Sequence, residues 1–213
     1  MSIQFYYGSG SPFSWNVWLV LEHKQLPYEF NLLTLQNGEL KRPGYLAINP
    51  HGKVPALVDD GFALWEASTI VEYLEERYPD FPVFPSTIRD RAIVRRLSAE
   101  ANSYLYPAVR RLMELTLLND NEDSDPVVIS TAFNELSHHL DYFENVLHSQ
   151  FFAGTISAAD FTIYPLLALL KRIDQRKPQL GVGDLIGAKL AGFMVQFEQL
   201  PYFTKTFPPH WKQ

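Results

Sequence analysis

One short stretch, Tyr7–Lys24 (YGSGSPFSWNVWLVLEHK), constrains the fold most, because a strand pattern ends in it and an apolar helix pattern begins. Apolar and polar residues alternate over Ser2–Tyr7, which predicts a strand with one buried face. Two glycines then end this strand. Ser11 followed by Pro12 is typical of a helix start, since serine accepts hydrogen bonds from unpaired amides and proline has no amide to leave unpaired.

The loop between this strand and helix is suited to hold an anion, because backbone amides and the positive end of the helix dipole point at a ligand above it. No lysine follows the glycines as in a P-loop, and Phe13 stands where G-x-G-x-x-G requires glycine. The nucleophile-elbow pattern G-x-S-x-G is absent as well. The anion that remains is a thiolate held by the Ser11 hydroxyl, and the alternative is that Ser11 only caps the helix.

The composition restricts the chemistry that the chain itself supplies. It has no cysteine, so any sulfur chemistry must use sulfur brought by a ligand. The six histidines show no metal-binding spacing, and we predict no metal. The net charge of −6, without a basic cluster, argues against nucleic acid as a partner. No apolar run reaches membrane-spanning length and the N-terminus has no leader pattern, so we expect a cytoplasmic protein without a membrane partner.

Residues 1–79 carry a strand, helix, strand pattern followed by a hairpin and a helix. Tyr28–Leu33 predicts a second strand, and the three elements together imply a parallel unit with a right-handed crossover. An Asp-Asp-Gly turn predicts the hairpin, and Glu66–Tyr78 has helical spacing. Pro55, at the start of the hairpin, indicates an edge strand or a cis peptide that exposes the backbone of Val54. This order of elements is that of a thioredoxin-like α/β domain.

The rest of the chain shows only helical patterns. Residues 80–87 (DFPVFPST) are rich in proline and small residues and are the predicted linker. Residues 88–213 are predicted to form an all-α domain, in which Arg89–Leu117 is one long helix kinked by Pro107. Further helices are predicted at Val127–His148, Ala159–Arg172 and Leu185–Gln199.

Two shorter segments of the helical half also have clear patterns. In ISAADF, Ser157 is the helix cap, Asp160 occupies the third helical position, and Ile156 and Phe161 form a hydrophobic staple. We expect this helix start to be buried and needed for folding rather than for chemistry. Asn119–Asp125 (NDNEDSD) is an acidic loop that we expect to be solvated.

Four motifs follow one another along the chain: Ser11-Pro12-Phe13-Ser14; the turn Asn49–Leu57 (NPHGKVPAL); Glu66–Ile70 with Tyr73-Leu74; and Ser157-Ala158-Ala159-Asp160. In this order and spacing they resemble the motifs of the cytosolic glutathione transferase family, in its serine-type classes (tau, zeta, phi, theta). The resemblance covers essentially the whole chain. It implies a thioredoxin-like glutathione-binding domain followed by an all-α domain that binds an electrophile.

The resemblance also implies glutathione as co-substrate and assigns roles in binding it. Ser11 would be the catalytic residue, donating a hydrogen bond to the glutathione sulfur. The Val54 backbone would pair with the cysteinyl part, and Glu66 would meet the γ-glutamyl ammonium. Lys41 and Lys53 match the positions that hold the glycyl carboxylate. The other implied glutathione-binding residues are Phe13, Pro55, Ala67 and Ser68.

The chain departs from the family pattern at one position of the binding site. Ala67 stands where the family usually has a serine that binds the γ-glutamyl carboxylate. Ser68, or the Ala67 amide at the helix start, is the alternative ligand for this carboxylate. Four other hydroxyls are alternatives to Ser11 as the group that activates the thiol: Ser9, Ser14, Tyr6 and Tyr7.

The predicted electrophile pocket lies around the Pro107 kink. Tyr104, Arg110 and Arg111 flank this kink, where the family builds its electrophile pocket, and the alternative is that the arginines form surface ion pairs. Trp15 and Trp18 are expected to pack against the helical domain.

Two functions are compatible with these residues. The first is an enzyme in which a glutathione thiolate attacks a small, apolar electrophile, by conjugation, isomerisation, dehalogenation or peroxide reduction. The lack of cysteine disfavours thiol-transferase activity. The second is a non-catalytic relative that serves as a partner-binding or regulatory module, which Ala67 favours. The family resemblance also implies a homodimer with a role in detoxification.

Overall fold

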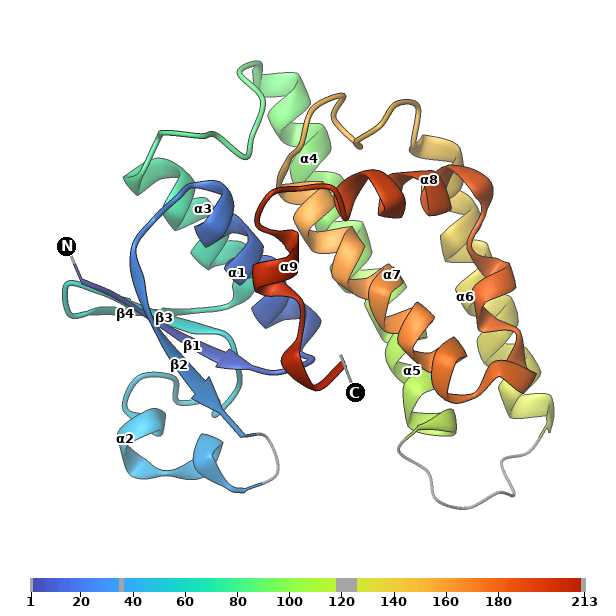
Figure 1. Cartoon of the computed structure of the whole chain (residues 1–213), viewed down its shortest axis with the longest axis horizontal. Coiled ribbons are helices and arrows are strands. Elements are labelled where there is room, and N and C mark those ends of the chain that lie inside the picture. Colours follow the sequence, from blue (N-terminus) through green and yellow to red (C-terminus); the bar gives the residue numbers. More distant parts are fainter. Residues whose placement is uncertain (1, 35–36, 118–125, 212–213) are drawn as a thin grey trace. The chain divides into compact units, whose positions relative to one another are not determined.

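The computed structural model describes residues 2–34, 37–117 and 126–211, and the chain divides into two compact units (Figure 1). The first contains the residues up to Phe84 and those from Pro201 on, and the second runs from Pro85 to Leu200. The C-terminal segment thus belongs to the first unit, whereas the sequence pattern assigns it to the helical half. The predicted acidic loop, Asn119–Asp125, lies outside the described residues.

The first unit is built on a four-stranded sheet in the order β2-β1-β3-β4. β1 runs parallel to β2, which confirms the predicted β-α-β unit, and antiparallel to β3. Ile3, Phe5 and Tyr7 are buried, as the alternation predicts, because they point to one face of the strand. The strands are β1 (Ile3–Gly8), β2 (Tyr28–Leu33), β3 (Ala56–Asp59) and β4 (Phe62–Trp65).

Helices cover this sheet in the thioredoxin-like arrangement that the sequence predicts. Figure 1 shows α1 and α3 together on one side of the sheet and α2 on the other. The α-helices of this unit are α1 (Pro12–His23), α2 (Pro43–Leu46), α3 (Ala67–Arg77) and α9 (Phe203–Thr206). Two short 3-10 turns accompany them, η1 (Glu39–Lys41) and η5 (Pro209–Trp211).

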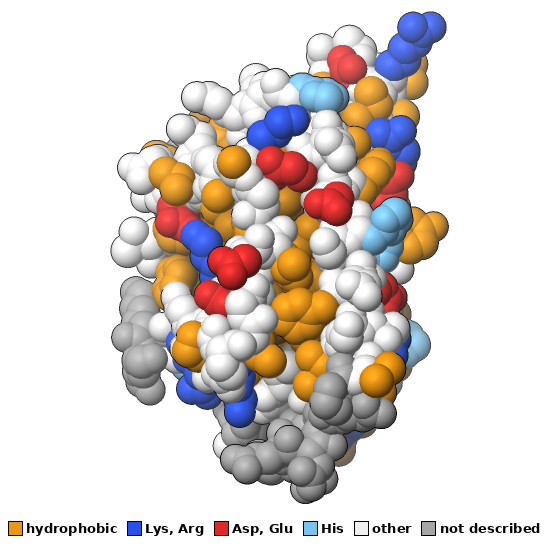
Figure 2. Space-filling model, turned by 90° about the vertical axis from the view of Figure 1, so that its right-hand side faces the viewer, with side chains coloured by type: hydrophobic (Ala, Val, Ile, Leu, Met, Phe, Trp, Pro, Cys, Tyr) orange, Lys and Arg blue, Asp and Glu red, His pale blue; other side chains and the backbone are white. Residues whose placement is uncertain are grey.

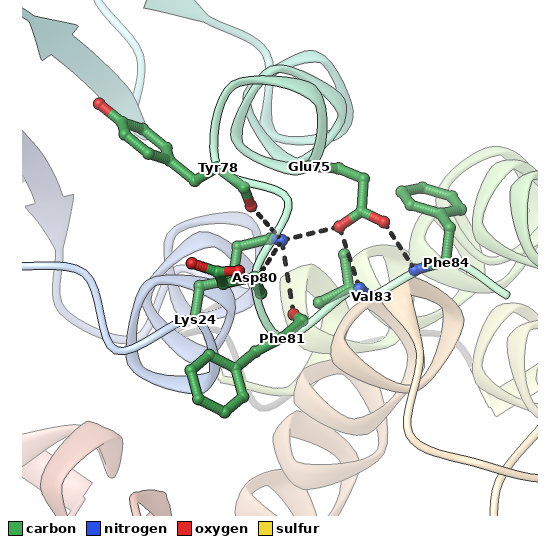
Figure 3. A network of polar contacts seen from close by, with 7 residues as sticks. All are labelled: Lys24, Glu75, Tyr78, Asp80, Phe81, Val83 and Phe84. Atoms are coloured by element: carbon green, nitrogen blue, oxygen red, sulfur yellow. Dashed lines mark hydrogen bonds and ion pairs between the residues drawn. The ribbon is translucent and has the colours of Figure 1, made fainter. Parts of the chain in front are cut away.

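A buried ion pair connects α1 and α3 to the segment that follows α3 (Figure 3). The Lys24 Nζ lies 2.7 Å from a carboxylate oxygen of Glu75, with side-chain exposures of 0% and 7%. Lys24 also donates to the carbonyls of Tyr78, Asp80 and Phe81, at 2.9, 3.3 and 3.4 Å. Glu75 accepts the backbone N–H groups of Val83 and Phe84. The pair therefore satisfies the polar backbone of a segment that has no regular secondary structure.

The two tryptophans of α1 contact aromatic side chains of the first unit. The Trp18 ring lies 5.0 Å from that of Tyr7 and 4.8 Å from that of Phe30, both on the sheet. Trp15 packs against the C-terminal segment, with its ring 5.8 Å from that of Phe207. We expected both to pack against the helical domain. Trp15 does contact residues of the predicted helical range, 88–213, but these residues belong to the C-terminal segment that joins the first unit. Trp18 instead contacts aromatic side chains of the sheet.

The second unit consists of helices packed around α7. Every residue from Ala158 to Leu170 of α7 is buried, because this helix contacts α4, α5 and α8. The helices are α4 (Ile88–Glu100), α5 (Tyr106–Thr116), α6 (Pro126–Val146), α7 (Ala158–Arg176) and α8 (Ala188–Phe197). The turns are η2 (Ala101–Leu105), η3 (Pro178–Leu180) and η4 (Val182–Leu185).

The helical path through Pro107 is continuous, as predicted, but its irregularity lies one turn earlier. α4 passes into α5 through the π turn η2, in which the Tyr106 N–H bonds to the Ala101 carbonyl. A π turn moves a carbonyl away from the position where the proline ring would clash with it. The wider turn before Pro107 therefore accommodates the proline.

The predicted capping box at the start of α7 is confirmed. Asp160 is fully buried and accepts hydrogen bonds from the Phe152 N–H at 2.9 Å and the Ser157 N–H at 2.8 Å. The Ser157 hydroxyl donates to the same carboxylate at 2.6 Å. Burial raises the pKa of Asp160 to about 7, although these hydrogen bonds act to lower it. The carboxylate joins the loop before α7 to the helix start, which is a folding role.

The exposed surface mixes apolar and charged side chains. Figure 2 shows one face on which hydrophobic side chains lie among acidic and basic ones. Within residues 2–34, 37–117 and 126–211, no helix is long and apolar enough to cross a membrane.

Candidate functional site

The register of the sheet brings three of the predicted segments to one edge of the first unit. Tyr6 of β1 pairs with Ala56 of β3, and Ala56 pairs with Trp65 of β4. The loop after β1, the residues before β3 and those after β4 therefore all lie at this edge. The predicted site residues in these segments are Ser11, Val54 and Glu66.

Ser11 caps α1 and keeps a proton for a ligand. Its hydroxyl oxygen accepts the Ser14 N–H at 3.3 Å, and its own N–H donates to the Gly8 carbonyl at 3.0 Å. A hydroxyl that accepts in this way still has its own proton to donate. Capping the helix and binding an anion are therefore compatible roles for Ser11, which is partly exposed.

The other two serines of the loop have different surroundings. Ser14 is fully buried, and its hydroxyl accepts the Gly8 N–H at 3.4 Å. The Ser9 hydroxyl lies 2.6 Å from Nδ1 of His210 in the C-terminal segment. Of the three loop serines, Ser11 therefore best combines partial exposure with a place at the helix start.

The two tyrosines at the end of β1 are less suited to activate a thiol. The Tyr6 hydroxyl donates to Gln4 Oε1 at 3.0 Å. Tyr7 is fully buried, and burial raises its pKa, as it does for Tyr6. These observations favour Ser11 over the tyrosines.

Val54 presents unpaired backbone groups at this edge. The Val54–Pro55 bond is cis, as one of the two sequence alternatives predicted. The other alternative, that Pro55 lies in an outer strand, is wrong, because β3 is an inner strand of the sheet. The Lys53 carbonyl accepts the Tyr45 hydroxyl at 2.5 Å and the Asn49 amide at 2.7 Å, which holds the preceding turn. Among the described residues, the Val54 N–H and carbonyl have no hydrogen-bond partner. They are available to an extended peptide.

Glu66 combines an unusual backbone conformation with a position at a helix start. Its φ is 69° and its ψ is 113°, a conformation that costs a non-glycine residue free energy and that often occurs at functional sites. No side chain caps α3, and within the described ranges the amides of Ala67, Ser68 and Thr69 have no acceptor. Ala67 is buried and Ser68 exposed. These amides and the helix dipole favour a carboxylate beside the Glu66 side chain.

The two lysines and Phe13 complete the predicted glutathione-binding set. Lys41 lies in η1 and Lys53 in the turn before β3, both exposed. Neither is in an ion pair with another described residue, so both charges are available to a ligand carboxylate. Phe13 is half-buried in the first turn of α1.

The residues predicted for the electrophile pocket lie on the second unit. Arg110 forms an ion pair with Glu114 at 2.7 Å, and Arg111 with Glu135 at 3.4 Å. Tyr104 is exposed and its ring stacks on that of His139. These contacts favour the alternative of surface ion pairs for the two arginines.

One residue near the site has no signal in the sequence. His210 belongs to an aromatic, proline-rich tail, and nothing in its local pattern places it beside Ser9. Within the described part of the chain, no group of three or more histidines and carboxylates is arranged to hold a metal ion.

Residues 10–77 match the family model of the glutathione S-transferase N-terminal domain. Glutathione S-transferase F10 of Arabidopsis thaliana is 31% identical over 160 residues, which are 71% of this chain and 74% of that protein. Maleylacetoacetate isomerase of Pseudomonas aeruginosa is 40% identical over 111 residues, 50% of this chain and 51% of that protein. Four further curated relatives are matched over 32 to 53% of their own length.

The solved structures extend this similarity to both units. A glutathione S-transferase from the Antarctic clam Laternula elliptica is 30% identical and superposes with a TM-score of 0.82, over 100% of this chain and 95% of that one. The similarity thus includes the thioredoxin-like domain and the helical domain. The chain belongs to the glutathione S-transferase family.

Proposed function

We propose that this protein binds glutathione at the edge formed by Ser11, Val54 and Glu66 and activates its thiol as a thiolate for attack on a small, apolar electrophile. The observation that carries the proposal is the Ser11 hydroxyl, which accepts a hydrogen bond from the helix and keeps its own proton at a helix N-terminus. A thiolate beside it gains one hydrogen bond and the favourable end of a helix dipole.

The groups at this edge are complementary to the tripeptide. The unpaired Val54 backbone pairs with the extended cysteinyl part, as an added strand does. Glu66 meets the ammonium group, and the free amides at the start of α3 bind the neighbouring carboxylate, so that Ala67 needs no hydroxyl. Lys41 and Lys53 bind the glycyl carboxylate. Two cations and one anion match a ligand that carries two carboxylates and one ammonium.

The lowering of the thiol pKa that catalysis requires is of the size that a hydrogen bond from Ser11 supplies. A free thiol has a pKa of about 8.5, and each unit of lowering requires about 1.4 kcal/mol of preferential stabilisation of the thiolate. A hydrogen bond to a charged group contributes about 1.5–3 kcal/mol. One such bond therefore makes the thiolate a substantial fraction of bound glutathione near neutral pH.

The helical unit provides the electrophile side in this proposal. Conjugation, isomerisation, dehalogenation and peroxide reduction share the first step, attack by the glutathione thiolate on an electrophilic atom. The family resemblance supports a cytoplasmic homodimer with a role in detoxification as part of the same proposal.

The proposal is tested by calorimetric titration of glutathione at about pH 7 in two buffers of different ionisation enthalpy, which yields the affinity and the number of protons released. The wild-type protein is expected to bind glutathione and release part of a proton. Ser11→Ala is expected to bind glutathione at most about tenfold more weakly and to release no proton, because the thiolate loses its donor.

Thr87→Ala is the matched control, because Thr87 caps α4 in the other unit as Ser11 caps α1. Both variants are expected to lose about 1 kcal/mol of stability, but Thr87→Ala should release protons as the wild type does. Binding without proton release in the wild type would contradict thiolate formation. Absence of binding at millimolar glutathione would instead favour the non-catalytic module that Ala67 suggests.

A further inference from the structure

The C-terminal segment, residues 201–211, is attached to α1 by polar contacts along the length of that helix. Near the end of α1, Nδ1 of His23 lies 2.9 Å from the Tyr202 hydroxyl. Lys205 forms an ion pair with Glu22 at 2.6 Å. These pairs hold the first half of the segment at the C-terminal end of α1.

Aromatic side chains of this segment enclose Trp15 in the first turns of α1. The Trp15 ring lies 6.2, 5.8 and 5.6 Å from the rings of Phe203, Phe207 and Trp211. Its indole N–H donates to the Thr206 hydroxyl at 3.2 Å. Trp15 is 1% exposed, and its backbone N–H donates to the carbonyl of Ser11 at 2.9 Å. The segment therefore packs around the residue that bonds directly to the Ser11 backbone.

At its end the segment reaches the loop on the other side of Ser11. Nδ1 of His210 lies 2.6 Å from the Ser9 hydroxyl. Gly10 has a φ of 82°, and a Cβ at this position would lie 2.8 Å from Cε1 of His210. The imidazole thus occupies the space directly above Gly10, and only glycine permits this approach.

We propose that His210 is a positioning residue for Ser11. Through His210, the C-terminal segment contacts Ser9 and Gly10, the two residues before Ser11. Its aromatic side chains also pack around Trp15, in the part of α1 that follows Ser11. A hydroxyl that donates to a thiolate must be held in one rotational and backbone arrangement, since a displaced donor loses most of the hydrogen bond. The segment therefore completes the thiol-activating loop from the far end of the chain.

This inference rests on the proposed function and specifies how Ser11 is kept in place. In this proposal His210 acts on Ser11 through Ser9 and Gly10, and not on the sulfur itself. Its removal is expected to leave the groups that bind the tripeptide backbone and charges intact. The effect should appear in the ionisation of the bound thiol and not in the affinity for glutathione.

The test is a pH titration of the ultraviolet absorbance of the bound thiolate in the full chain. The same titration with S-methylglutathione, which has no thiol, is subtracted to remove the signal of the tyrosines. His210→Ala is expected to lower the thiolate fraction at about pH 7 by about three- to tenfold, with the glutathione Kd changed by less than about twofold. His210→Asn retains a polar atom near the place of Nδ1 and is expected to restore most of the signal.

Ser9→Ala provides an independent variant of the same contact. It is expected to lower the thiolate fraction as His210→Ala does, and the double variant should lose no more than either single one, because both remove one interaction. His148→Ala, which removes an exposed histidine of the second unit, is the control and should titrate as the wild type does.

The proposal is wrong if His210→Ala and Ser9→Ala both titrate like the wild type, or if their effects add independently. A wild-type protein that binds glutathione without any thiolate signal would contradict the proposed function itself. The two failures are therefore distinguishable, since the second is seen before any variant is made.

Discussion

Lys24→Met is expected to lower the free energy of unfolding by about 3–5 kcal/mol, measured by urea denaturation. The substitution leaves the carboxylate of Glu75 buried without its cation, at a site where Lys24 is fully buried. It also removes the donor that serves three backbone carbonyls after α3. A buried charge and several unpaired carbonyls together account for the size of the effect.

Two further variants separate the burial of the charge from the loss of the ion pair. Lys24→Met combined with Glu75→Leu removes both charges and is expected to recover part of the stability, but not all, since the N–H groups of Val83 and Phe84 then lack an acceptor. Arg110→Met breaks an ion pair of the same length whose side chains are 56% and 49% exposed. It should cost less than about 1 kcal/mol. Equal losses from Lys24→Met and Arg110→Met would contradict this account.

Glu66→Ala is expected to weaken glutathione binding by about ten- to a hundredfold, measured as the calorimetric Kd. The physical reason is that the proposed binding mode places the Glu66 carboxylate against the ammonium group, a contact worth about 1.5–3 kcal/mol. Glu66→Gly should weaken glutathione binding as much as Glu66→Ala does. Its free energy of unfolding should be about 1 kcal/mol higher than that of Glu66→Ala. Glycine adopts a φ of 69° without the steric cost that alanine and glutamate both have there.

Glu76→Ala is the matched control, because Glu76 is exposed on the same helix and its removal changes the net charge equally. It should leave the Kd unchanged within about twofold, since an exposed carboxylate far along the helix is screened from the ligand. If Glu66→Ala bound glutathione as well as Glu76→Ala does, Glu66 would have no role in binding. If Glu66→Gly were less stable than Glu66→Ala, the positive φ at this position would not cost alanine free energy.

The elements that border the candidate site follow from local patterns. The alternation of Ile3, Phe5 and Tyr7 predicts β1, and Ser11 with Pro12 predicts the start of α1; the structure has both. The capping box at Asp160, in the second unit and outside the candidate site, is likewise present. In each case the interacting groups lie within a few residues of one another, so that their hydrogen bonds and burial depend little on the rest of the chain.

The family motifs identified the candidate site residues, and the sheet register explains why these residues lie close together. Val54 and Glu66 lie in separate motifs, and the pairing of Ala56 with Trp65 brings them to one edge. The position of the π turn η2 could not be predicted from the sequence, because a π turn before Pro107 and a kink at Pro107 fit the same residue pattern.

The amino-acid sequence by itself determined the order of the elements, the start of α1 at Ser11 and the absence of a protein thiol, because these depend on residue type and short spacing. The tertiary structure alone decided the ion pair of Lys24 with Glu75 and the contact of Ser9 with His210, residues 201 positions apart. One lysine or histidine among many shows no preference for a distant partner in the sequence. Such contacts exist only once burial of the surrounding apolar side chains has brought the two segments together.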